Sequence, residues 1–381
     1  SAAPASSSSS SSGPARGSLT STPPALLATV TSNDLTLRLT AAANQALLGL
    51  SGSPVCDIGD YRIEYNTVGA KNEATTASAA LLVPHGTDAR CQGARPIVLY
   101  AHGTSTDKAY DIADLRNTDN AEGLLLAAQF ASQGYIVVAP NYTGYVGSTL
   151  AYHPYLVADA QSKDMIDALA AARSALAAPA IQVGDSGKLF ITGYSQGGYV
   201  AMATQRAMEA AGMTVTATAP MSGPYALAAF VDAVFNGQVN GGAPVYITLL
   251  LTAYQRAYGD VYGAPTEAFE SAYANGIDTL LPTTLSRSQL YAQGKLPQAV
   301  LFSSTPPDAS YASITPATQP AAFASLFAQG VGTGNLVRNS FRASYVADAR
   351  AHPDGGWPTV TTAAPTSSAA FALRQDLARN D

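Results

Sequence analysis

Charged side chains are scarce in this sequence, since Asp, Glu, Lys and Arg make up only 12% of its 381 residues and the formal net charge is −6. The 20 Lys and Arg residues form no cluster or stripe that could follow a phosphate backbone. Nucleic acid is therefore not an expected partner. Long apolar runs are lacking too. Those at 123–131 and 246–254 fall well short of the roughly 20 residues that cross a bilayer, so we expect no transmembrane segment.

Cysteine is nearly absent, with only Cys56 and Cys91 in the chain. They flank a polar, strand-like segment, and we interpret them as one disulfide formed in an oxidising compartment. Two unrelated free thiols in a cytosolic protein are the alternative. No second Cys or His lies at ligand spacing from either cysteine, so a zinc site is not expected. This pattern predicts a protein that is secreted, periplasmic or extracellular.

Residues 1–24 are rich in Ser, Pro and Ala and include a run of seven serines. Such a tract cannot bury apolar surface, so it predicts a disordered linker. It contains no apolar signal-peptide core, which we interpret as a leader already removed or left out. A linker of this kind can tether an exported domain to a wall, a membrane lipid or a second module.

The remaining chain has the composition of a folded protein, because 47% hydrophobic residues can build a full core. Residues 32–50 have helical spacing, with candidate N-caps at Ser32, Asn33 and Asp34. Residues 61–68 and 77–84 have the alternation of strands, and a turn-rich stretch separates them.

Apolar runs and helical patterns then alternate along the chain. The runs lie at 96–103, 135–140, 188–194 and 213–220, and the helical patterns between them at 120–134, 157–177 and 195–212. This order predicts an α/β fold with a mostly parallel sheet covered by helices on both faces. In such sheets the chemistry gathers at the carboxyl ends of the strands, where the segments "HGT", "NYTGYVG" and "YSQGG" fall.

The second half loses this rhythm. Its helical stretches at 243–259, 265–281 and 339–350 are rich in Tyr and Phe. We therefore predict three parts after the linker: a core at 25–222, a helical cap or lid inserted at 223–350, and a loop with a short helix at 351–381. The last part contains no further apolar strand.

The stretch "ITGYSQGGYV" at 191–200 places Ser195 between Gly193 and Gly197, directly after an apolar strand and before a helix. A nucleophilic serine at such a turn needs small residues two positions before and after it, because they crowd its backbone. The helix that follows directs its positive end toward a developing oxyanion. An inert serine in a tight strand-to-helix turn is the alternative.

These motifs resemble those of the α/β-hydrolase superfamily. "YAHGTST" is similar to its oxyanion loop, and "VVAPNYTGYVGS" to its strand-and-loop signature, with Asn141 where an aspartate is common. The resemblance implies that the backbone N–H groups of Thr104 and Gln196 form the oxyanion hole. It covers residues 55–225, is strongest with secreted bacterial esterases of the secretory-lipase type, and implies ester hydrolysis without a metal or an organic cofactor.

The histidine and carboxylate that would activate Ser195 are hard to find. His102 belongs to the oxyanion-loop motif and is expected to be structural, while His85 and His153 lie in loop-like segments with no expected role. His352 is the only histidine after Ser195, with Asp348 four residues before it. In the superfamily these groups follow the nucleophile on loops after two further strands. Asp348 and His352 could form a catalytic pair, but a histidine near the C-terminus of a surface helix is the favoured interpretation. We therefore expect the catalytic histidine and carboxylate beyond Asp381: either the chain is a fragment, or a separate C-terminal piece completes the sheet.

The leading hypothesis is a secreted serine esterase or lipase that forms an acyl-enzyme on Ser195. The aromatic and apolar cap favours a lipophilic acyl chain or an aromatic ester as substrate. A serine peptidase or acyltransferase on the same fold is one alternative. A non-catalytic binding module is another, supported by the missing histidine and carboxylate.

Overall fold

The computed structural model describes residues 14–353 and 369–381, and its central element is a seven-stranded sheet in the order β1-β2-β3-β5-β4-β6-β7. The first three strands pair antiparallel, and β3 pairs antiparallel with β5. From β5 onward the neighbours β4, β6 and β7 are parallel. The strands span Ala25–Val30, Asp57–Val68, Ala74–His85, Arg95–Ala101, Ile136–Pro140, Asp185–Tyr194 and Ala217–Met221. The predicted α/β fold is thus confirmed.

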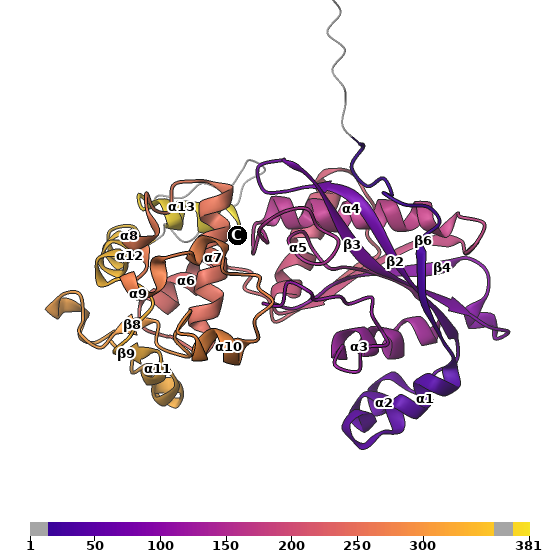
Figure 1. Ribbon diagram of the computed structural model, residues 1–381, viewed down its shortest axis with the longest axis horizontal. Coiled ribbons are helices and arrows are strands. Elements are labelled where there is room, and N and C mark those ends of the chain that lie inside the picture. Colours follow the sequence, from indigo (N-terminus) through magenta and orange to yellow (C-terminus); the bar gives the residue numbers. More distant parts are fainter. Residues whose placement is uncertain (1–13, 354–368) are drawn as a thin grey trace, which may run out of the picture.

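Helices cover both faces of the sheet (Figure 1). One face carries α4 (Ala158–Leu176) and α5 (Gln196–Ala210), and the other carries α3 (Ala121–Gln129), α1 (Ser32–Thr40) and α2 (Gln45–Ser51). Successive strand residues alternate between two hydrophobic cores, since Leu81 packs in the core under α4 and Leu82 in the core under α3. This alternation follows from the two-residue period of a strand.

The region before β2 differs from the prediction in two ways. The strand β1 is not predicted from the sequence. The helix expected at 32–50 is two helices, α1 (Ser32–Thr40) and α2 (Gln45–Ser51), joined by a 3-10 turn. The N-cap is Thr31, and the candidates after it already lie inside the helix. Thr31 has extended backbone angles, and its hydroxyl accepts a 3.0 Å hydrogen bond from the Asp34 N–H.

Part of the tract predicted to be a disordered linker, from Arg16 onward, packs against the core. Residues 1–13 lie outside the described residues. Arg16 forms a bidentate ion pair with Asp167 of α4, with both N–O distances at 3.0 Å. Leu19 forms an isolated antiparallel β-bridge with Tyr65 of β2. The linker predicted for 1–24 therefore has to end before Arg16.

The predicted disulfide is confirmed. Cys56 and Cys91 are bonded, and they join the start of β2 to the 3-10 turn that precedes β4. Along the described ranges, no helix combines the length and the apolar composition that crossing a membrane requires.

Residues after β7 form a helical layer at one end of the sheet (Figure 1). Its helices are α6 (Leu227–Phe235), α7 (Ala243–Ala257), α8 (Pro265–Ala268), α9 (Ser271–Ala274), α10 (Arg287–Ala292), α11 (Ala324–Gln329), α12 (Asn339–Ala351) and α13 (Ala372–Arg379). The single helical stretch predicted at 265–281 is instead broken into α8, α9 and a 3-10 turn. Phe269 and Glu270 are extended between α8 and α9, and Gly276 adopts a left-handed conformation between α9 and the 3-10 turn. Two-residue strands at Phe302–Ser303 and Val331–Gly332 also form a pair.

A buried arginine joins three of these helices. Arg374 of α13 donates to Asp232 of α6 at 2.8 and 2.9 Å and to Asp348 of α12 at 2.7 Å. Its side chain is fully buried. Asn380, just after α13, accepts the N–H of Ala158 at 2.9 Å, so this end of the chain also fastens the helical layer to α4.

We expect Arg374→Met to destabilise the fold by about 3–5 kcal/mol, because it leaves two carboxylates without their buried partner. Arg173→Met is the matched control: Arg173 also pairs with an aspartate, Asp185, but at the surface, where the loss should stay below about 1 kcal/mol. Urea unfolding of both variants measures the difference. Equal losses would show that the buried pair has no special role.

Candidate active site

Ser195 occupies a strained turn between β6 and α5. Its backbone angles are φ 57° and ψ −120°, a region that residues other than glycine rarely adopt. The Ser195 N–H donates to Met221 O of β7 at 2.9 Å. The turn therefore holds Ser195 at the carboxyl end of the parallel strands, as the sequence predicts.

The flanking glycines are required by close backbone approach. A Cβ at Gly197 would overlap the carbonyl group of Ala101 at the end of β4, and a Cβ at Gly193 would overlap the carbonyl oxygens of both Gly197 and Ala101. Gly198 is constrained in the same way by Met221 O. Because a backbone carbonyl cannot rotate out of the way as a side chain can, only glycine fits these positions.

The structure brings the predicted oxyanion residues to Ser195. Thr104, Ser195 and Gln196 line one cavity. Within the described residues, the N–H groups of Thr104 and Gln196 donate to no other backbone or side-chain acceptor. Gln196 is also the first residue of the 15-residue helix α5, so the positive N-terminal end of this helix lies beside Ser195 at the same cavity. The arrangement can therefore stabilise a negative oxygen next to Ser195.

The cavity beside Ser195 has a volume of about 270 Å³ and a mostly apolar wall. Leu227, Phe230 and Val231 come from α6, and Tyr246, Ile247 and Leu250 from α7. The remaining lining residues are Thr104, Tyr155, Leu156, Ser195, Gln196, Ser222, Gly223, Pro224 and Asn240. The helical layer thus supplies one wall of the cavity and the sheet supplies its polar floor.

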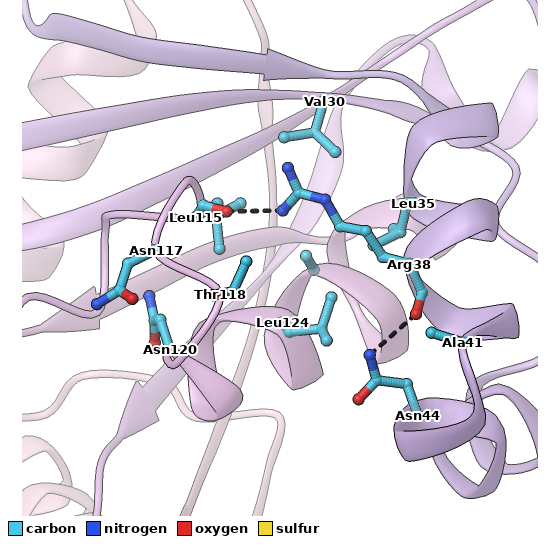
Figure 2. A pocket seen from close by; sticks show the side chains of 11 residues that line it. Val30, Leu35, Arg38, Ala41, Asn44, Leu115, Asn117, Thr118, Asn120 and Leu124 are labelled. Atoms are coloured by element: carbon cyan, nitrogen blue, oxygen red, sulfur yellow. Dashed lines mark hydrogen bonds between the residues drawn. The ribbon is translucent and has the colours of Figure 1, made fainter.

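A second cavity of about 290 Å³ lies between α1, α3 and the loop at 115–120 (Figure 2). An Arg38 nitrogen donates to Leu115 O at 2.6 Å, and Asn44 donates to Arg38 O at 2.9 Å. The residues that line it include no serine, cysteine, histidine or carboxylate. Its one hydroxyl group, that of Thr118, has no histidine or carboxylate beside it in the lining to activate it, and the cavity of Ser195 is the candidate site.

His102 is buried under the oxyanion loop. Its Nδ1 lies 2.6 Å from Gly103 O, its Nε2 lies 3.2 Å from Asn141 O, and its ring stacks on Tyr142 with centroids 4.0 Å apart. Burial lowers the pKa of His102. The Gly103 N–H donates to Glu122 Oε1 at 3.1 Å, so the loop is fixed from two sides. This geometry agrees with the structural role expected for His102.

Asn141 also has a structural position. Its Oδ1 accepts the Ile112 N–H at 2.8 Å, and its Nδ2 donates to Ser78 Oγ at 2.9 Å and to Asp111 Oδ1 at 3.0 Å. An aspartate here would face the Asp111 carboxylate without a proton to share. The departure from the superfamily pattern therefore suits the neighbouring acid.

The sequence places His153 in a loop with no expected role, but in the structure its side chain contacts Gln196. It is fully buried, and Gln196 Nε2 donates to its Nε2 at 2.7 Å. Its Nδ1 donates to Thr143 O at 2.9 Å. Burial lowers the pKa of His153 to about 3, so the ring is neutral. The sequence carries no local signal for this contact, since 43 residues separate the two side chains.

The other two histidines lie apart from the candidate nucleophile. His85 ends β3 and is half-buried, with its pKa lowered by burial. His352 Nε2 lies 3.9 Å from Asp348 Oδ1, but Asp348 is bound by Arg374. Neither His352 nor Asp348 is among the residues that line the cavity of Ser195, and nor is any other described histidine.

Comparisons with known proteins find similarity to hydrolases. The model of the prolyl oligopeptidase family matches residues 125–240, which include Ser195. The crystal structure of the rice cell wall degrading esterase LipA from Xanthomonas oryzae is 28% identical, with 96% of this chain and 79% of that chain covered and a TM-score of 0.72. Its ligand-bound form is 27% identical, with the same coverage and TM-score.

A more distant structure shares the fold. It is a protein of Legionella pneumophila whose name assigns it only to the hydrolases, with 21% identity, 85% of this chain and 74% of that chain covered, and a TM-score of 0.63. A search of curated proteins finds no match.

Proposed function

This chain belongs to the α/β-hydrolase superfamily and is a serine hydrolase of the esterase type, and we propose that it hydrolyses carboxylic esters through an acyl-enzyme on Ser195. One observation carries the proposal. A strained serine, Ser195, lines the same mostly apolar cavity as Thr104 and Gln196, whose backbone N–H groups have no acceptor among the described residues. Nucleophile and oxyanion hole in this relation are what acyl transfer requires.

In the proposed reaction, Ser195 Oγ attacks the ester carbonyl carbon while its proton passes to a histidine. The oxygen of the tetrahedral intermediate accepts hydrogen bonds from the N–H groups of Thr104 and Gln196. The histidine then gives the proton to the alcohol oxygen, the C–O bond breaks, and the acyl group stays on Ser195. A water molecule, activated by the same histidine, releases the carboxylic acid and restores the serine.

We propose that the histidine of this scheme lies outside these 381 residues. All four histidines of the sequence lie in described residues, and none lines the cavity. The edge strand β7 offers a place for the missing segment. Among the described residues it pairs only with β6, and the side chains of Met221, its last residue, and Tyr225, four positions later, are 46% and 40% exposed. We propose that a segment pairs with β7, covers these side chains and carries the histidine and its carboxylate.

The apolar wall from α6 and α7 favours esters with a lipophilic acyl group or an aromatic acid. The cavity volume of about 270 Å³ favours esters with short and medium acyl chains over those with long ones. We therefore expect kcat/KM for p-nitrophenyl octanoate to exceed that for p-nitrophenyl palmitate. A preference for the palmitate ester would mean that the substrate lies outside the cavity.

An amide or peptide substrate is the second candidate, because the matching family model is that of a peptidase family. Assaying p-nitrophenyl octanoate beside octanoyl p-nitroanilide separates the two. Higher kcat/KM on the anilide would favour a peptidase. We also propose that the protein acts outside the cytosol, supported by the Cys56–Cys91 disulfide and by its likeness to a cell wall degrading esterase.

A further inference from the structure

One short loop contacts both halves of the candidate oxyanion hole. Residues 152–157 connect the turn after β5 to α4, and two of their side chains point to different partners. His153 accepts from the side chain of Gln196 at 2.7 Å. Two residues later, the Tyr155 hydroxyl lies 3.0 Å from Thr104 Oγ1. Gln196 and Thr104 otherwise belong to different strand ends, β6 and β4.

The contact between His153 and Gln196 has a defined direction. The Nδ1–H of His153 donates to Thr143 O at 2.9 Å, which leaves the Nε2 lone pair to accept from Gln196 Nε2. Burial lowers the pKa of His153 to about 3, so the ring is neutral at neutral pH, and the hydrogen bond to Thr143 O selects this tautomer. Gln196 is itself buried, and its Oε1 has no partner among the described residues. His153 is thus the only described side chain that holds the Gln196 amide.

The oxyanion loop is held in the same manner by hydroxyl groups. Tyr155, whose ring lines the cavity, holds the Thr104 hydroxyl. Tyr142 donates to His102 O at 3.0 Å, and Tyr145 donates to Ser105 O at 2.6 Å. Each of these tyrosines is fully or nearly fully buried. The loop that carries Thr104 therefore cannot shift without breaking several buried hydrogen bonds.

The connecting loop is itself rigid. Leu156 has a φ of 55°, and its carbonyl oxygen accepts from Tyr199 at 3.2 Å and from Tyr254 at 3.0 Å. The Leu156 N–H donates to Gln161 Oε1 at 2.9 Å. Side chains of α4, α5 and α7 thus hold the segment that carries His153 and Tyr155. This one segment can therefore hold both Thr104 and Gln196 in place.

On the basis of the proposed ester hydrolysis, we propose that His153 and Tyr155 are positioning residues that set the separation between the Thr104 and Gln196 N–H groups. Oxyanion donors act only when they lie about 2.7–3.1 Å from the oxygen that becomes charged. A misplacement of about 1 Å can lower the rate on the order of 10²-fold. The pair acts on catalysis through Thr104 and Gln196, without touching the reacting atoms.

The test compares His153→Phe, His153→Gln and Tyr155→Phe with wild type on p-nitrophenyl octanoate. We expect His153→Phe to lower kcat about 10–100-fold with KM nearly unchanged, because the loss falls on the transition state. His153→Gln should recover most of the rate, since its carboxamide oxygen can accept from Gln196. Tyr155→Phe should lower kcat less. His85→Gln, at the far end of β3, is the control and should leave kcat unchanged.

The pH profile separates positioning from proton transfer. His153→Gln should keep the wild-type shape of kcat against pH. If the residual turnover of His153→Gln loses the acid limb of the profile, His153 is the base and the positioning role is wrong. If both His153 variants keep kcat within twofold of wild type while wild type hydrolyses the ester, the positioning role also fails.

A structural readout makes the inference independent of activity. Crystal structures of wild type and His153→Phe should differ in the separation of the Thr104 and Gln196 backbone nitrogens by about 0.5 Å or more, the tolerance of a working site. An unchanged separation would overturn the inference. Absence of ester turnover by wild type, together with no labelling of Ser195 by a fluorophosphonate, would instead count against the proposed function.

Discussion

Ser195→Ala should abolish ester hydrolysis, with a loss in kcat of about 10⁶-fold, the effect of removing the serine of a Ser-His-Asp site. The hydroxyl is the proposed attacking group. Ser222 lines the same cavity and also has a positive φ, 53°, but Ser195 directly precedes α5, whose first residue is Gln196. Folding should be unaffected, because Ser195 Oγ makes no hydrogen bond to another described residue.

The matched control is Ser174→Ala, an exposed serine on α4 whose hydroxyl bonds only Ala170 O. It should keep wild-type kcat. Initial rates on p-nitrophenyl octanoate measure both variants. A Ser195→Ala protein that retains a tenth of the wild-type rate would mean that hydrolysis proceeds by another group.

Gly197→Ala should lower the free energy of unfolding by about 3 kcal/mol and remove most of the activity. The added methyl would overlap the carbonyl of Ala101, so β4 and α5 would have to move apart. Overpacking of this kind costs typically 1–3 kcal/mol, and more where backbone has to shift. The shift would also displace the Gln196 N–H from the oxyanion position.

Gly49→Ala tests the same substitution where there is room. Gly49 lies inside α2, and a Cβ there meets nothing within 4 Å. Alanine should therefore stabilise the protein by up to about 1 kcal/mol through its higher helix propensity. Thermal and urea unfolding of both variants give the comparison. If the two glycines respond alike, the close packing at the Ser195 turn is not what fixes Gly197.

The parts of this molecule that follow local rules could be predicted from the sequence. The strand and helix before and after Ser195, and the need for glycine at 193 and 197, follow from a short pattern whose partners are neighbours in the chain. The parallel strands were found because buried strands read as continuous apolar runs. The strand Ala25–Val30 carries a similar run, but it follows the Pro- and Ser-rich tract. From the sequence it is placed at the start of the core, and no strand is predicted there.

Contacts between distant residues were out of reach. His153 has no sequence mark that distinguishes it from a surface histidine, and its role depends on the path of the chain between β5 and α4. The Asp232–Arg374–Asp348 contact joins residues up to 142 positions apart. From the sequence, a pair of Asp348 with His352, the nearer partner along the helix, is only conceivable. Burial decides the matter, because the fully buried guanidinium needs the carboxylate more than the half-exposed imidazole does.

The most direct test is the intact mass of the protein purified from its natural source, before and after reaction with a fluorophosphonate. This reagent labels only serines that a base has activated. The account predicts one adduct, located by peptide mapping on Ser195, and its loss in Ser195→Ala. A protein that hydrolyses esters but carries no adduct, or carries it on another serine, would contradict the assignment of Ser195 as the nucleophile.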